Sequence, residues 1–184
     1  MTFLARLFER TQPLASAETF ASFYESTHLN VYRYIMALRG GRQDEAEDIT
    51  AEAYLRAWKN RHQFDGSADA ALGWVLTIAR RILIDRFRIF SRLPETDLVD
   101  DLPDATLDAE SILVAEERSG NVITALLTLP ENQREIIVLR YVLGWRVNQI
   151  ADHLGILENT VSVVLRRTLK RLQGMLASEG GPND

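Results

Sequence analysis

The chain has 184 residues, of which 21 are Lys or Arg and 26 are Asp or Glu, so its formal net charge is −5. It contains no cysteine, which excludes a disulfide-stapled secreted module, a cysteine-ligated zinc site and a thiol nucleophile. The apolar fraction of 46% is enough for one domain of ordinary size, or two small ones, to bury a core. No stretch approaches about 18 consecutive apolar residues, so we expect a cytoplasmic protein with no membrane insertion of its own.

The negative charge is concentrated in one segment. Residues 93–124 carry nine acidic residues and one basic residue, whereas the blocks before and after them are close to neutral. The first part of this segment has two prolines and no basic residue, a composition typical of a linker. The expected organisation is an N-terminal extension (1–17), a first domain (18–92), an acidic linker (93–108), a second domain (109–177) and a mobile tail (178–184).

Helical periodicity runs through the first block, and no sustained apolar–polar alternation predicts a strand. The first helix is expected over residues 18–38, and Gly40 and Gly41 follow it. A second is expected over residues 44–62, which begin with an acidic turn, and a third over residues 70–90. These three helices predict one compact bundle. The apolar stripe predicted for the second helix is Ala46, Ile49, Ala53, Leu55, Ala57 and Trp58.

The second block is also helical, and it contains the pattern of a helix-turn-helix. Such a motif needs a small residue where its helices cross and a glycine at the turn, and Ala151 lies four residues before Gly155. The fold class is therefore all-α, with two small helical domains, although a helical hairpin that does not contact DNA remains an alternative for this motif. Helices are expected over residues 109–128, 130–144, 147–154 and 158–176. The residues expected to be buried in the motif are Ile150, Leu154, Ile156, Val161 and Val164.

The second helix of this motif carries polar and basic residues that suit DNA. Glu158, Asn159 and Ser162 lie near its N-terminal end, where a recognition helix meets base edges. Arg166 and Arg167 follow, and their guanidinium groups could bind phosphates. Lys170 and Arg171 come next, where cations near a helix C-terminus are also favoured by the helix dipole alone.

The third helix of the first block has a second basic face. Thr77, Arg81, Arg88 and Arg92 fall on one stripe, with Trp74 and Asp85 near it. This face could bind a nucleic-acid backbone beside an aromatic ring that stacks on bases. It could equally be a solvated surface, with Trp74 in the core.

Enzyme chemistry finds little support. The three histidines lie in different predicted helices without a nucleophile nearby in the sequence, and no glycine-rich phosphate loop is present. Glu25 and His28 match one element of a carboxylate-bridged metal bundle, but the second copy that such a site requires is missing. We therefore expect no catalytic activity, no cofactor and no metal.

Three stretches together carry a family resemblance. They read AEDITAEAYLRAW (46–58), GWVLTIARRILIDRFR (73–88) and LPENQREIIVLRYVLGWRVNQIADHLGILENTVSVVLRRTLKRL (129–172). The chain resembles the bacterial RNA polymerase sigma factors of the sigma-70 family, in the compact extracytoplasmic-function (ECF) group. The resemblance implies two domains, which bind core polymerase, direct it to promoters and help to melt them.

The resemblance also assigns roles to residues. It implies docking on the coiled coil of the polymerase β′ subunit by Asp48, Ile49, Glu52, Leu55, Arg56 and Trp58. It implies recognition of the minus-10 element, with capture of a flipped base, by Phe64, Asp65, Trp74, Thr77, Arg80, Arg81 and Arg88. It implies recognition of the minus-35 element by Glu158, Asn159, Thr160, Ser162, Val163, Arg166 and Arg167. The helices before the helix-turn-helix correspond to the part that meets the polymerase β flap.

Several positions depart from the family pattern. A Lys-Ser-Arg run common in the recognition helix is Ser162-Val163-Val164, and the usual capping Ser is Leu157. In the third helix a common Asn is Arg81, and the arginine run common after Arg88 is Ile89-Phe90-Ser91. These changes leave two alternatives open, a stand-alone helix-turn-helix regulator and a degenerate sigma-like protein that binds polymerase or an anti-sigma factor without initiating. The resemblance further implies an anti-sigma partner, which could hold the protein at the membrane.

Overall fold

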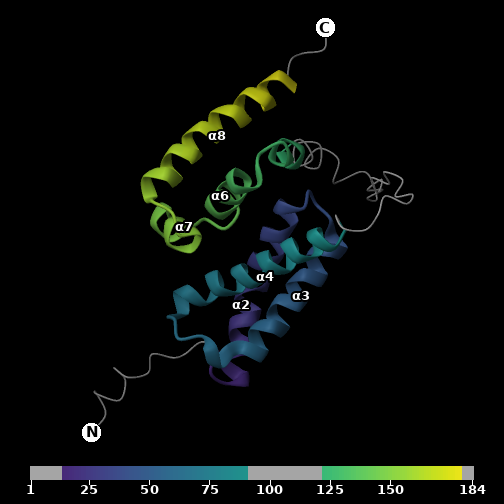
Figure 1. Ribbon diagram of the computed structural model, residues 1–184, viewed down its shortest axis with the longest axis vertical. Helices are drawn as coiled ribbons and strands as arrows, with labels where there is room; N and C mark the ends of the chain where they lie inside the picture. Colours follow the sequence, from purple (N-terminus) through teal and green to yellow (C-terminus); the bar gives the residue numbers. More distant parts are fainter. Residues whose placement is uncertain (1–13, 91–121, 180–184) are drawn as a thin grey trace. The chain divides into compact units, whose positions relative to one another are not determined.

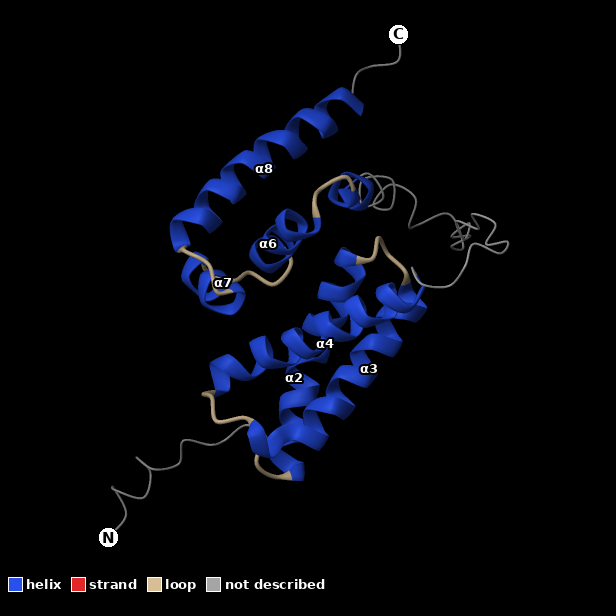
Figure 2. Ribbon diagram, viewed as in Figure 1, coloured by secondary structure: helices blue, strands red, loops and turns tan. Residues whose placement is uncertain are grey.

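The computed structural model describes residues 14–90 and 122–179 of the chain. In these ranges all regular secondary structure is helical, as the sequence predicts (Figure 2). The described residues divide into two compact units, one formed by residues 14–36 and 42–84, the other by residues 37–41, 85–90 and 122–179. The predicted acidic linker lies outside the described residues, and so does most of the predicted N-terminal extension.

The first unit contains α2 (Ala17–Leu38) up to residue 36, α3 (Gln43–Asn60), the 3₁₀ turn η1 (Arg61–Gln63) and α4 (Ala68–Phe90) up to residue 84 (Figure 1). A reciprocal cap begins α2, because the Thr19 amide donates to the Ser16 hydroxyl and the Ser16 amide donates to the Thr19 hydroxyl. Helix α3 begins with Asp44 and Glu45 in its first turn, where carboxylates are favoured by the helix dipole. The three helices lie within a few residues of their predicted bounds.

The core of the first unit is formed by one face of each helix. Fully buried positions in α3 recur at steps of three and four residues, which is the period of a helix that packs on one side. Leu55 is not among them: its side chain is 61% exposed, so the predicted apolar stripe was wrong there. The buried core residues of this unit are Leu14, Phe23, Val31, Tyr34, Ile35, Ala46, Ile49, Ala53, Tyr54, Ala57, Ala71, Val75, Leu76, Ala79, Ile82 and Leu83.

The second unit contains a helical segment over residues 122–127, followed by α6 (Glu131–Tyr141), α7 (Val147–Leu154) and α8 (Glu158–Glu179). Arg134 closes the end of the first segment, because its guanidinium donates to the carbonyl oxygens of Leu126, Leu127 and Leu129 at 2.9 to 3.0 Å. Desolvation lowers the pKa of this guanidinium from its ordinary value. The side chain therefore satisfies carbonyl groups that a helix end leaves without partners.

The turn between α7 and α8 has the glycine that the sequence predicts. Gly155 adopts φ 66° and ψ 35°, a left-handed conformation that favours glycine, and its amide donates to the Ala151 carbonyl. Ile150 and Val161 are buried on either side of the turn. Ile156, predicted to be buried with them, is 37% exposed, so the prediction was wrong there; its amide donates to the Ala151 carbonyl and closes the turn.

Candidate functional site

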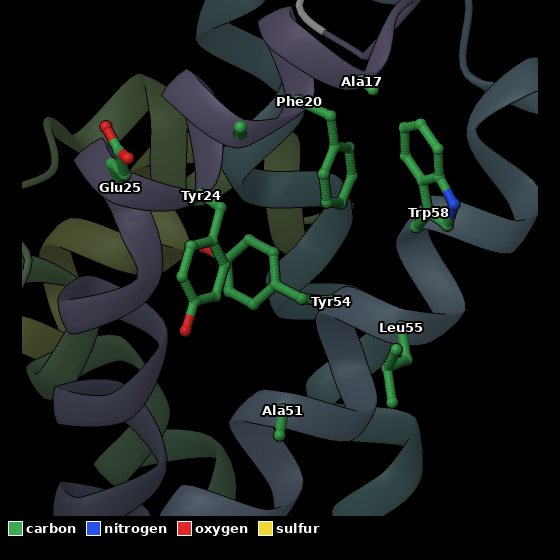
Figure 3. A pocket seen from close by; sticks show the side chains of 9 residues that line it. Ala17, Phe20, Tyr24, Glu25, Ala51, Tyr54, Leu55 and Trp58 are labelled. Atoms are coloured by element: carbon green, nitrogen blue, oxygen red, sulfur yellow. The ribbon is translucent and has the colours of Figure 1, made fainter.

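An apolar groove runs along the surface between α2 and α3, with a volume of about 660 Å³ (Figure 3). Aromatic rings from both helices form its floor and one rim, and Leu55 projects from α3 beside it. Small alanine side chains keep it open along both helices. The nine lining residues are Ala17, Phe20, Ala21, Tyr24, Glu25, Ala51, Tyr54, Leu55 and Trp58.

Trp58 is held at one end of the groove by contacts on two sides. The Phe20 ring meets its indole edge-on, with ring centroids 5.0 Å apart, which is a favoured geometry for aromatic pairs. On the other side the guanidinium carbon of Arg61 lies 3.7 Å from the centre of the indole ring. Arg61 also donates a hydrogen bond of 2.8 Å to the Trp58 carbonyl. A half-buried tryptophan is thus fixed in one orientation at the surface.

Tyr54 forms the floor of the groove. Its hydroxyl lies 2.7 Å from the Thr27 hydroxyl, and the ring of Tyr24 packs edge-on against it at 4.9 Å. Burial raises the pKa of Tyr54 to about 12, because the charged phenolate would lose its hydration; the Thr27 hydrogen bond works in the opposite direction. No sequence signal singled out Tyr54, since it falls between two apolar positions of the predicted stripe.

The residues predicted to bind polymerase divide into exposed and buried positions. Asp48, Leu55 and Arg56 are exposed on α3, and Glu52 pairs with Arg56 through a short salt bridge on the same helix. Ile49 is fully buried in the core. We therefore correct its predicted role: its side chain supports α3 from within and lies off the surface.

The loop after η1 places Phe64 against Trp74 of α4. The centroids of the two rings are 5.2 Å apart, and both side chains are half-buried. Gly66 permits this arrangement, because a Cβ atom there would lie 2.6 Å from the tip of the Phe64 ring. Asp65 remains exposed next to the pair.

The predicted basic face of α4 is present in part. Arg81 is exposed and Arg80 is half-buried, so the two neighbouring guanidinium groups differ in their access to solvent. The Thr77 hydroxyl donates to the Gly73 carbonyl at 2.9 Å, one turn earlier. The side chain of Arg88 and all of Arg92 lie outside the part of the chain that the structure describes.

The start of α8 presents a polar end followed by basic residues. Glu158, Asn159, Thr160 and Ser162 are exposed, and Val163 is half-buried. Arg166, Arg167, Lys170 and Arg171 are exposed further along the helix. Leu157 occupies the capping position, where its carbonyl accepts the Thr160 amide and its side chain is 75% exposed.

A ring pair that the sequence analysis missed braces the helix-turn-helix. Trp145 lies just before α7 and meets the His153 ring of that helix edge-on, with centroids 5.1 Å apart. Arg140 of α6 donates to the Trp145 carbonyl at 2.8 Å. No pattern in the sequence connects these residues, because the contact depends on how the loop before α7 turns.

Comparison with known proteins matches both units to one family. The Sigma-70 region 2 model matches residues 23–91, and the Sigma-70, region 4 model matches residues 119–172. The ECF RNA polymerase sigma factor SigK of Mycolicibacterium vanbaalenii is 32% identical, over 87% of this chain and 83% of its own length. The chain belongs to the ECF sigma factors of the sigma-70 family.

This ECF sigma factor has further relatives in sequence and in fold. The ECF RNA polymerase sigma factor SigX of Bacillus subtilis is 28% identical, over 85% of this chain and 82% of its own length. The sigma factor RpoE of Bartonella quintana, solved with the anti-sigma factor NepR, has the same fold, with a TM-score of 0.64 and 22% identity. That likeness covers 88% of this chain and 98% of the solved one.

The described residues of this sigma factor contain neither a helix suited to a membrane nor a cluster of metal ligands. None of the described helices is both long enough and apolar enough to cross a membrane. His, Asp and Glu side chains do not gather anywhere in residues 14–90 and 122–179 into a group of three that could hold a metal ion.

Proposed function

We propose that this ECF sigma factor docks on the coiled coil of the polymerase β′ subunit through the exposed face of α3 and the groove beside it. The observation that carries the proposal is Leu55, a leucine 61% exposed at the rim of an apolar groove. An exposed apolar side chain next to a tryptophan fixed in one orientation is typical of the anchors that dominate protein interfaces. Asp48 and the pair formed by Glu52 and Arg56 add a charged rim on the same helix.

In the same proposal, the loop 64–69 and α4 recognise the minus-10 element. Phe64 and Trp74 supply half-buried rings, and a flipped base needs such apolar and aromatic walls to replace the stacking it loses. Asp65 offers a carboxylate that can accept hydrogen bonds from a base edge. Arg80 and Arg81 supply positive charge toward the DNA backbone, with Thr77 one turn before Arg81.

We further propose that α8 enters the DNA at the minus-35 element. Its exposed N-terminal turn carries Glu158 and Asn159, which can accept from cytosine or pair with adenine in the major groove. Arg166 and Arg167 lie two turns later and would contact phosphates. Because Ser162 and Val164 stand where the family has cations, the arginines carry most of the charge at this interface.

The helices of the second unit before α7 would meet the β flap, and an anti-sigma factor would cover the polymerase-binding faces. The role of an anti-sigma factor is supported by the solved sigma factor RpoE of Bartonella quintana, which is bound to the anti-sigma factor NepR. An anti-sigma factor anchored in a membrane would hold this cytoplasmic protein there. The chain itself would carry out no catalysis and need no cofactor.

The direct test of the docking surface is Leu55→Asp. Since Leu55 is exposed, the substitution leaves the core intact, and we expect affinity for core polymerase to fall about tenfold or more. Lys59→Asp, on the same helix and also exposed, introduces the same residue outside the groove and serves as the matched control. Equal affinity of Leu55→Asp and the native chain would contradict the proposal.

A further inference from the structure

We propose that residues 1–13 of this chain occupy the α2–α3 groove in the free protein and compete with polymerase for it. The sequence of this segment, MTFLARLFERTQP, has apolar residues at positions that share one face of a helix. Phe3, Leu4, Leu7 and Phe8 form that face, Arg6 and Glu9 fall on the opposite side, and Arg10 lies at the edge of the apolar face beside Phe3. The apolar face of such a segment can pack against the apolar walls of the groove.

The attachment point of the segment lies at the groove itself. Leu14, the first described residue, is 1% exposed, and the Ser16–Thr19 cap fixes the entry into α2. Ala17 and Phe20 then line the groove. The segment is therefore tethered at one end of its proposed site, and a short tether raises the effective concentration to the millimolar range. The segment could therefore occupy the groove even if the same contact were too weak to form between separate molecules.

Length and charge also fit. A helix over residues 3–12 would be about 15 Å long, and the α2 side of the groove, from Ala17 to Glu25, rises about 12 Å. Glu25 is the one charged side chain among the nine described residues that line the groove. Arg10, at the edge of the apolar face of the segment, is the matching charge.

The consequence for polymerase binding rests on the proposed function of the groove. If residues 1–13 cover Leu55 and Trp58, polymerase can dock only when the segment leaves. The apparent affinity is then reduced by the fraction of molecules whose groove is free. A groove occupied in about four-fifths of the molecules would lower the affinity about fivefold.

A spin label tests the occupancy in the free protein. The native chain has no cysteine, so Ala5→Cys gives one labelling position in the segment. We expect the label to broaden the NMR signals of Ala21, Ala51 and the Trp58 indole, by the same amount at all protein concentrations. The added pair Leu7→Asp and Phe8→Asp should abolish the broadening, whereas Thr2→Asp with Gln12→Asp, on the polar side, should preserve it.

Two results would overturn the inference. Groove signals that stay sharp would show that the segment does not occupy the groove, and broadening that grows with protein concentration would assign the groove to a second copy. Binding to core polymerase then tests the competition: deletion of residues 2–12 should raise the affinity about fivefold, and an unchanged affinity would contradict it. The spin-label experiment uses the free protein without polymerase. It therefore tests occupancy of the groove even if the docking proposal fails.

Discussion

The guanidinium of Arg61 lies 3.7 Å from the centre of the Trp58 ring and also donates to the Trp58 carbonyl. One side chain thus fixes both the ring and the backbone at the end of α3. Arg61→Ala should lower the free energy of unfolding by about 1 kcal/mol, as expected for a hydrogen bond and a cation–π contact near the surface. Urea denaturation followed by circular dichroism measures this, with the exposed Lys59→Ala as the control. An equal loss of unfolding free energy in Arg61→Ala and Lys59→Ala would show that the Arg61 contacts do not stabilise the protein.

The close approach of Gly66 to Phe64 leads to a second prediction. In Gly66→Ala the new methyl group would lie 2.6 Å from the tip of the Phe64 ring, so the ring must shift from its place beside Trp74. We expect promoter melting to fall while the fold stays intact, because Phe64 is a half-buried loop side chain outside the core. Permanganate reactivity of unpaired thymines measures melting, and Ser67→Ala in the same loop is the control. Normal melting by Gly66→Ala would show that the ring pair is not required.

A third prediction concerns the capping position of α8. Leu157 offers no side-chain acceptor there and exposes 75% of its surface. Leu157→Ser should raise the free energy of unfolding of the second unit by about 1 kcal/mol, because a serine hydroxyl can accept an amide of the first turn. Leu157→Ala removes the exposed leucine without adding a cap and should give no comparable gain. Thermal denaturation of the three proteins distinguishes these outcomes.

The pKa of Tyr54 predicts how stability changes in alkali. Burial raises this pKa from 10.0 to about 12, so the folded protein holds the proton more tightly than the unfolded chain does. The stabilisation is complete below pH 10 and is lost as the pH rises from 10 toward 12. Tyr54→Phe cannot titrate, so its stability should fall less steeply in that window, whatever its stability at neutral pH. Parallel slopes for the two proteins would contradict a raised pKa.

The sequence predicts the helices well because their signals are local. Periodic apolar residues, glycines and acidic first turns each act within a few residues, and the helix bounds depend mainly on them. The burial of Leu55 and Ile156 was predicted wrongly for a related reason: periodicity assigns a face, but the neighbouring helix decides whether that face is covered. The groove therefore could not be predicted, since it exists only where α2 and α3 leave small alanines opposite aromatic rings.

Residue roles depend on contacts between distant parts of the chain. The pairing of Phe64 with Trp74 crosses a loop, and the bracing of His153 by Trp145 depends on the turn before α7. Ile49 shows the limit of resemblance as well: a position in a matching motif received a surface role, although its side chain is fully buried. The exposure of a side chain has to be known before a binding role can be assigned to its position in a motif.

The charge on α8 gives a prediction about DNA binding. Arg166→Ala with Arg167→Ala should weaken binding to promoter DNA and reduce the salt dependence, with the slope of log K against log salt falling by about 2. Lys170→Ala with Arg171→Ala is the matched pair further along the helix. A slope that does not change in the Arg166 and Arg167 variant would exclude phosphate contacts by these residues.

Binding of core polymerase through the α3 surface and of promoter DNA through α8 would make the protein an initiation factor. Transcription by core polymerase tests this most directly. Purified core enzyme is incubated with a library of genomic fragments, with and without the protein, and the RNA start sites are mapped. We expect new, sharply defined starts that require the native chain and are lost with Leu55→Asp. Stable binding to core enzyme without new starts, or starts that Leu55→Asp supports equally well, would contradict the account.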